Sequence, residues 1–122
     1  MPFVDCEDAK IDYELEGDGR DIALLHGIAA SFKYWCFQRE VLSKRTRTIL
    51  VDLRGDGLSD GMMREKAFTV PRFASSVRAV LKALHVDATI MMGHSLGGIT
   101  ALQYTLDSPS EVDAQILADT SS

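Results

Sequence analysis

The chain has 122 residues, of which 46% are apolar and 25% charged, a composition typical of one water-soluble globular domain spanning residues 1–122. Its 13 basic and 18 acidic side chains give a net charge of −5 with no basic stripe, which argues against nucleic acid or an anionic membrane as a partner. No secretory signal opens the sequence, and no apolar run is long enough to span a bilayer. Cys6 and Cys36 do not make a disulfide framework, so we expect two thiols in a reducing, cytoplasmic compartment.

Apolar runs along the chain predict strands that alternate with helices. The segment 11–15 alternates apolar and polar residues, as a strand with one wet face does, and a turn follows at 17–19. Continuous apolar runs, which are typical of buried strands, lie at 22–25, 48–51, 89–92 and 114–118. Apolar residues at helical spacing predict helices at about 32–42, 73–84 and 96–106. This order predicts a three-layer α/β/α fold with a mostly parallel sheet.

The run Gly93-His94-Ser95-Leu96-Gly97-Gly98 lies between a predicted strand and a predicted helix. In that context Gly-x-Ser-x-Gly indicates a nucleophile elbow, a strained turn that presents the Ser95 hydroxyl above the sheet edge. Gly93 and Gly97 supply the small neighbours that such a turn requires. The Leu96 N–H, at the start of the helix, is then a candidate donor to an oxyanion. A glycine-rich turn without a chemical role is the alternative, but the strand before it and the helix after it favour the elbow.

A second motif, His26-Gly27-Ile28, follows the predicted strand 22–25. It therefore lies at the carboxyl edge of the sheet, where open α/β sheets build their sites. In an acyl-transfer enzyme a backbone N–H from this loop completes the oxyanion hole, and we assign that donor to Ile28. His26 and Gly27 are expected to support the shape of the loop. A polar turn residue is the simpler interpretation of an isolated His-Gly pair.

Four stretches together resemble the α/β-hydrolase fold family, in its branch of serine esterases, lactonases and haloperoxidase-like enzymes, across nearly all of the chain. They are 24–28, 52–60, 93–98 and 116–120. The resemblance implies that the chain corresponds to the N-terminal half of the family's core, without its C-terminal strands and cap. Asp56 departs from the family, which commonly has a histidine or an aromatic residue there. In this loop Asp52 and Arg54 are expected to fix the geometry. The serine nucleophile resembles that of the hydrolytic and perhydrolytic members, whereas dehalogenases and epoxide hydrolases use an aspartate.

A catalytic base is not evident. The family's triad runs in the order serine, acid, histidine, and serine needs a base within hydrogen-bond reach. The three histidines, His26, His85 and His94, all precede Ser95. We expect His85 to be a surface or helix-capping residue and the His94 side chain to point away from the hydroxyl. Asp119 is a possible acid, or a strand-end residue bonded to local backbone.

Two functions from different classes remain open, and so does the question of whether the chain alone is an enzyme. The first is a serine hydrolase acting on a small ester or lactone through an acyl-enzyme on Ser95, with no metal and no cofactor. The second is a non-catalytic interaction module that pairs through the exposed edge of its last strand. Its expected partners are a second copy or a complementing C-terminal half. A dinucleotide-binding domain is excluded because no Gly-x-Gly-x-x-Gly follows the first buried strand.

Overall fold

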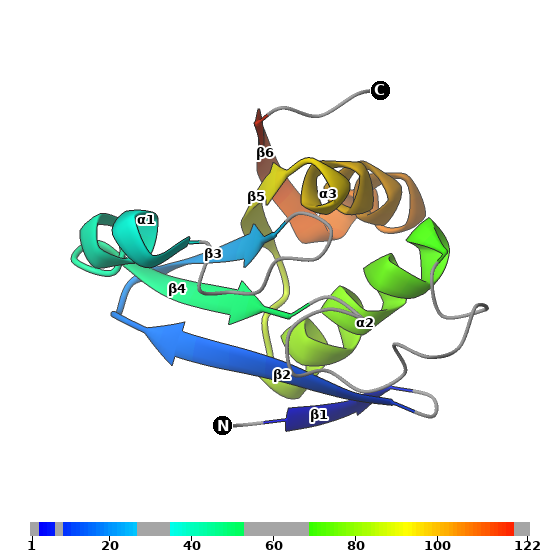
Figure 1. Cartoon of the computed structure of the whole chain (residues 1–122), viewed down its shortest axis with the longest axis horizontal. Coiled ribbons are helices and arrows are strands. Elements are labelled where there is room, and N and C mark those ends of the chain that lie inside the picture. Colours follow the sequence, from blue (N-terminus) through cyan, green and yellow to red (C-terminus); the bar gives the residue numbers. More distant parts are fainter. Residues whose placement is uncertain (1–2, 7–8, 27–34, 53–68, 119–122) are drawn as a thin grey trace.

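A computed structural model describes residues 3–6, 9–26, 35–52 and 69–118, and its elements follow one another as Figure 1 shows. The strands are β1 (Phe3–Cys6), β2 (Ala9–Glu16), β3 (Arg20–Leu25), β4 (Thr46–Val51), β5 (Thr89–His94) and β6 (Val112–Ala118). The helices are α1 (Cys36–Leu42), α2 (Val70–Ala83) and α3 (Leu96–Asp107), with a short 3₁₀ turn at Pro109–Glu111. The predicted strands and helices are present, and β1 is an additional strand that the sequence pattern does not indicate.

The six strands form one sheet in the order β1-β2-β4-β3-β5-β6. The pairs β1–β2 and β2–β4 are antiparallel, whereas β4, β3, β5 and β6 run parallel to one another. At the carboxyl edge Leu25 of β3 lies opposite Val51 of β4 on one side and Gly93 of β5 on the other. The residues that follow these three strands therefore emerge side by side.

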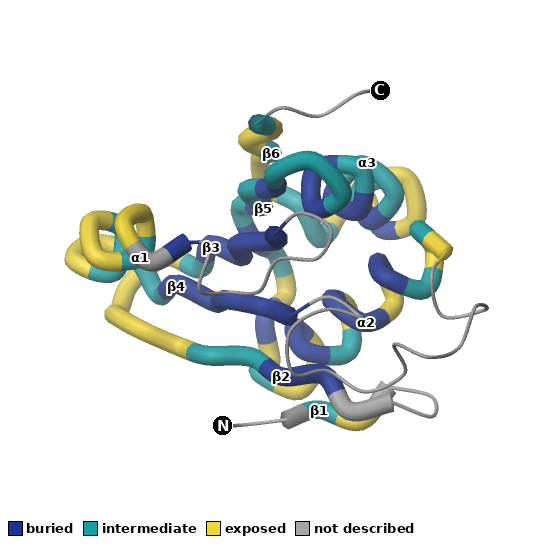
Figure 2. Tube along the Cα trace, in the orientation of Figure 1, coloured by how far each residue is buried: buried dark blue, intermediate teal, exposed yellow. Residues whose placement is uncertain are grey.

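Helices cover both faces of the sheet, which confirms the predicted three-layer α/β/α architecture. Trp35, at the start of α1, packs on Ile22, Leu24 and Leu50 on one face. Helices α2 and α3 close the other face with the larger core, and the carboxyl halves of β3 and β4 between the layers are buried (Figure 2). None of the helices in the described ranges is long and apolar enough to cross a membrane.

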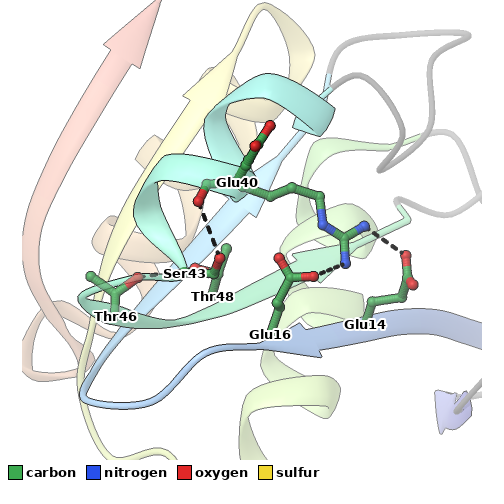
Figure 3. A network of polar contacts seen from close by, with 7 residues as sticks. Glu14, Glu16, Glu40, Ser43, Thr46 and Thr48 are labelled. Carbon is green, nitrogen blue, oxygen red and sulfur yellow. Dashed lines mark hydrogen bonds and ion pairs between the residues drawn. The ribbon is translucent and has the colours of Figure 1, made fainter.

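Helix α1 is attached to the sheet by a polar network as well as by packing. The Arg39 guanidinium donates to Glu14 at 3.1 Å and to Glu16 at 3.3 Å, so it joins the helix to β2 (Figure 3). On the outer side of α1, Phe37 and Val41 are 78% and 65% exposed. The helix therefore holds its place over β4 while presenting two large apolar side chains outward.

Helix α2 begins and ends with recognisable local signals. The Thr69 hydroxyl accepts a hydrogen bond from the Arg72 N–H, and Pro71 lies in the first turn, where its missing N–H costs no hydrogen bond. At the other end His85 is left-handed, with φ of 59°. The His85 and Val86 N–H groups donate to the Lys82 and Leu81 carbonyls, which is the hydrogen-bond pattern of a Schellman cap. His85 is exposed there, so it is a helix-capping residue as expected.

Candidate active site

Ser95 occupies the turn between β5 and α3 in a conformation that L-residues rarely adopt, with φ of 54° and ψ of −116°. A non-glycine residue in such a sparsely populated region costs about 1–3 kcal/mol. Backbone hydrogen bonds hold the turn on both sides. The Ser95 N–H donates to the Ala118 carbonyl at 3.1 Å, and the Ser95 carbonyl accepts from the Gly98 and Ile99 N–H groups at 3.0 and 3.1 Å. The strain is therefore supported by β6 and by the first turn of α3.

Two glycines let the backbone pack around this turn. A Cβ on Gly93 would lie 2.5 Å from the Gly97 carbonyl carbon and oxygen. A Cβ on Gly97 would lie 2.1 Å from the Leu25 carbonyl oxygen and 2.7 Å from that of His26. Neither position has room for a side chain, because the neighbouring atoms belong to the backbone. The end of β3 thus contacts the beginning of α3 directly.

Helix α3 starts at Leu96, so the first N–H groups of the helix lie next to Ser95. The positive end of the helix dipole lies there, and it favours a developing negative charge. Ile28, the second predicted donor, and Gly27 lie outside the described residues. The oxyanion hole formed by Ile28 and Leu96 therefore stays a prediction.

His26 and Asp52 meet at the carboxyl edge of the sheet. The His26 Nε2 lies 3.6 Å from the Asp52 Oδ1, and the two side chains are 0% and 1% exposed. His26 directly follows β3 and Asp52 directly follows β4, which are neighbouring parallel strands. The sequence motifs assign both residues to site loops but do not pair them. The pairing could have been predicted only from the strand order, because residues that directly follow adjacent parallel strands lie side by side.

The other candidate residues are distributed as follows. His94 is the last residue of β5 and is half-buried next to Ser95, whereas His85 lies at the C-terminal end of α2, before β5 begins. Asp119, the possible acid, lies outside the described residues. The described segments contain no group of three or more His, Cys, Asp or Glu side chains that could hold a metal ion.

Comparison with known proteins decides the family. A model of the alpha/beta hydrolase fold matches residues 22–122. The chain belongs to the α/β-hydrolase family. Its sheet and helices superpose on an N-acyl homoserine lactone degrading enzyme, Est816, with a TM-score of 0.93 and 33% identity over 98% of this chain. A hydrolase from Pseudomonas aeruginosa superposes with a TM-score of 0.90 and 30% identity, also over 98% of this chain.

A curated relative of this α/β hydrolase, the putative carbamate hydrolase RutD of Azorhizobium caulinodans, is 32% identical over 92% of the chain. The chain spans less than half the length of these proteins, namely 42% of RutD, 45% of Est816 and 46% of the Pseudomonas hydrolase. The family is thus established, whereas the substrates of these longer proteins remain properties of those proteins.

Proposed function

We propose that this α/β hydrolase is a serine hydrolase that cleaves a small ester or lactone through an acyl-enzyme on Ser95. The observation that carries the proposal is the strained conformation of Ser95 at the junction of β5 and α3. Backbone strain of this kind is concentrated at functional sites, where the surroundings maintain it. Similarity to a lactone-degrading enzyme at 33% identity supports the substrate class.

In the proposed reaction the Ser95 Oγ attacks the acyl carbonyl carbon as its proton passes to a general base. The carbonyl oxygen becomes an oxyanion, which the Ile28 and Leu96 N–H groups would stabilise. The carbon–oxygen bond to the leaving alcohol then breaks, and the alcohol takes the proton. A water molecule then attacks the carbonyl carbon of the acyl-enzyme in the same way, which releases the acid and returns the proton to the Ser95 Oγ. For a lactone the alcohol and the acid are one product.

We propose that the base is a histidine supplied by polypeptide outside these 122 residues, with Asp119 as a candidate acid. All three histidines of the chain precede Ser95, contrary to the family's order. The 122 residues alone would then retain only positioning and oxyanion stabilisation, which in dismantled triads leave about 10³-fold acceleration over water. A cytoplasmic location stays a proposal from the sequence.

A second candidate function is a non-catalytic module that pairs through β6. Within the described residues the sheet ends at β6, where Ile116 and Leu117 are 47% and 42% exposed. An edge strand with large apolar side chains is a template for pairing with another chain. A second copy or a complementing C-terminal half is the partner proposed for this edge.

An active-site-directed fluorophosphonate separates the two functions. We expect a covalent adduct on Ser95, mapped by peptide mass spectrometry, that is lost in Ser95→Ala. The control is Ser75→Ala, an exposed serine on α2 that lies away from the elbow. Because the base is proposed to lie outside these 122 residues, labelling is expected to be slow. A chain that stays unlabelled at Ser95 after long incubation with excess probe would contradict the retained oxyanion stabilisation and favour the interaction module.

A further inference from the structure

The buried contact between His26 and Asp52 is linked through the backbone to β2 on one side and to the start of α3 on the other. On one side the Asp52 N–H donates to the Asp12 carbonyl at 3.0 Å, which anchors Asp52 to β2. On the other side the Asp52 Oδ1 lies 3.6 Å from the His26 Nε2. Position 26 is thereby held relative to β2 and β4 as well as to its own strand.

The backbone at position 26 in turn contacts the nucleophile helix. The Leu25 and His26 carbonyl oxygens fill the space that a Cβ on Gly97 would occupy. Gly97 is the second residue of α3, and the Gly98 and Ile99 N–H groups that follow it bond to the Ser95 carbonyl. A shift of the His26 backbone would therefore be transmitted to the turn that holds Ser95.

Burial of this pair is unfavourable in itself. Removing a carboxylate and an imidazole from water costs free energy that their mutual attraction only partly offsets, and apolar replacements of such pairs are often neutral or stabilising. A polar contact has a direction that an apolar contact lacks, so it can fix the position of a strand end. We therefore expect the pair to fix the end of β3 rather than to add to the free energy of unfolding.

We propose that Asp52 and His26 are positioning residues for the nucleophile elbow. Asp52 orients the His26 imidazole, which fixes the Leu25–His26 backbone against Gly97 and so maintains the strained turn at Ser95. The effect on catalysis rests on the proposed function, whereas the effect on the conformation of the elbow does not.

Amide hydrogen exchange of the 122-residue chain, resolved by NMR, tests this role. The readout is the exchange rate of the Gly98 and Ile99 amides divided by that of the Val86 amide, which bonds to Leu81 at the far end of α2. Asp52→Ala leaves the buried His26 imidazole without its carboxylate partner, so we expect this ratio to rise by about tenfold. Asp52→Asn retains an oxygen near His26 and is expected to restore a ratio near that of the wild type.

The control is Asp21→Ala. Asp21 pairs with Arg47 across the same two strands, β3 and β4, but at their amino ends. We expect this variant to leave the ratio unchanged even where it lowers the free energy of unfolding. If the exchange ratio rose equally in Asp21→Ala, or if all amides exchanged equally faster in Asp52→Ala, the His26–Asp52 pair would have only a general stabilising role and the proposal would be overturned. Should Asp52→Ala not fold, His26→Phe keeps a ring of similar size and is expected to raise the same ratio.

Fluorophosphonate labelling distinguishes a failure of this proposal from a failure of the proposed function. A wild-type chain unlabelled at Ser95, with the exchange ratio raised in Asp52→Ala, contradicts the hydrolase and supports the positioning pair. A labelled wild-type chain whose exchange ratio and labelling rate are unchanged in Asp52→Ala overturns the positioning pair alone.

Discussion

The Ser95 N–H donates a hydrogen bond to the Ala118 carbonyl at 3.1 Å, which joins the turn at Ser95 to the last residue of β6. The carbonyl of the same serine is bonded to the first turn of α3. The turn is therefore held between an edge strand and a helix. Any chain that pairs with β6 would act on a strand to which Ser95 is directly bonded.

Replacing Ser95 by glycine is expected to stabilise the protein, because glycine adopts positive φ without a steric penalty. We predict that Ser95→Gly raises the free energy of unfolding by about 1 kcal/mol relative to Ser95→Ala, which keeps a Cβ in the strained turn. Urea denaturation of the two variants measures the difference. Equal stabilities would show that the turn carries no such strain.

Gly97→Ala is expected to be strongly destabilising. Its Cβ would lie 2.1 Å from the Leu25 carbonyl oxygen, so β3 and α3 must separate. Overpacking of this kind predicts a loss of about 3 kcal/mol in the free energy of unfolding, measured by urea denaturation. Gln103→Ala on the same helix is the control, with a change within about 0.5 kcal/mol. A Gly97→Ala variant as stable as that control would contradict the close packing at the elbow.

His85→Gly is expected to stabilise the C-terminal cap of α2. The left-handed conformation of His85 penalises a side chain, and glycine removes the penalty while the two capping hydrogen bonds remain. We predict a gain of about 1 kcal/mol in the free energy of unfolding. Ala79→Gly, in the interior of the same helix, should lose about 1 kcal/mol instead. Changes of the same sign in both variants would count against the cap.

A cluster around Glu111 predicts a dependence of stability on pH. The Glu111 carboxylate accepts from the Tyr104 hydroxyl at 2.9 Å and pairs with Arg78 at 3.1 Å and Lys82 at 3.6 Å. Burial alone would raise the pKa of Glu111, but the Tyr104 bond and the two cations outweigh it and lower the pKa below 4.5. Burial and the bond to Glu111 raise the pKa of Tyr104 above 10.0.

Because the pKa of Glu111 is lower in the folded than in the unfolded state, its contribution is complete at neutral pH. It is lost as the pH falls from about 4.5 through the lower, folded pKa. We predict that Glu111→Gln costs about 1 kcal/mol at pH 7 and makes little difference once the wild-type carboxyl is protonated. Thermal unfolding across the acid range measures this, with Glu40→Gln on the exposed side of α1 as the control. A cost that persists unchanged at the lowest pH would contradict the ionic contribution.

Much of the fold follows from local pattern. The strands 22–25, 48–51 and 89–92 and the helix after Ser95 are indicated by unbroken apolar runs and by helical spacing, and they lie where the sequence predicts. Strand β1 is not indicated because it is a short segment, Phe3-Val4-Asp5-Cys6, paired only at the sheet edge.

The candidate site is predicted less completely, because part of it depends on strand order. The elbow is a local motif, so Gly93, Ser95 and Gly97 can be found from sequence alone. The contact between His26 and Asp52 arises because β4 lies next to β3, an arrangement that no periodicity encodes.

The most direct test of Ser95 as the nucleophile is to trap the acyl-enzyme. The chain is incubated with p-nitrophenyl acetate, quenched in acid and digested, and the peptide containing Ser95 is examined by tandem mass spectrometry. We predict one acetyl group on the Ser95 hydroxyl, formed slowly because the base is proposed to lie outside these residues, and none at position 95 in Ser95→Ala. Acetylation confined to lysines and the N-terminus, at equal levels in both proteins, would contradict the assignment.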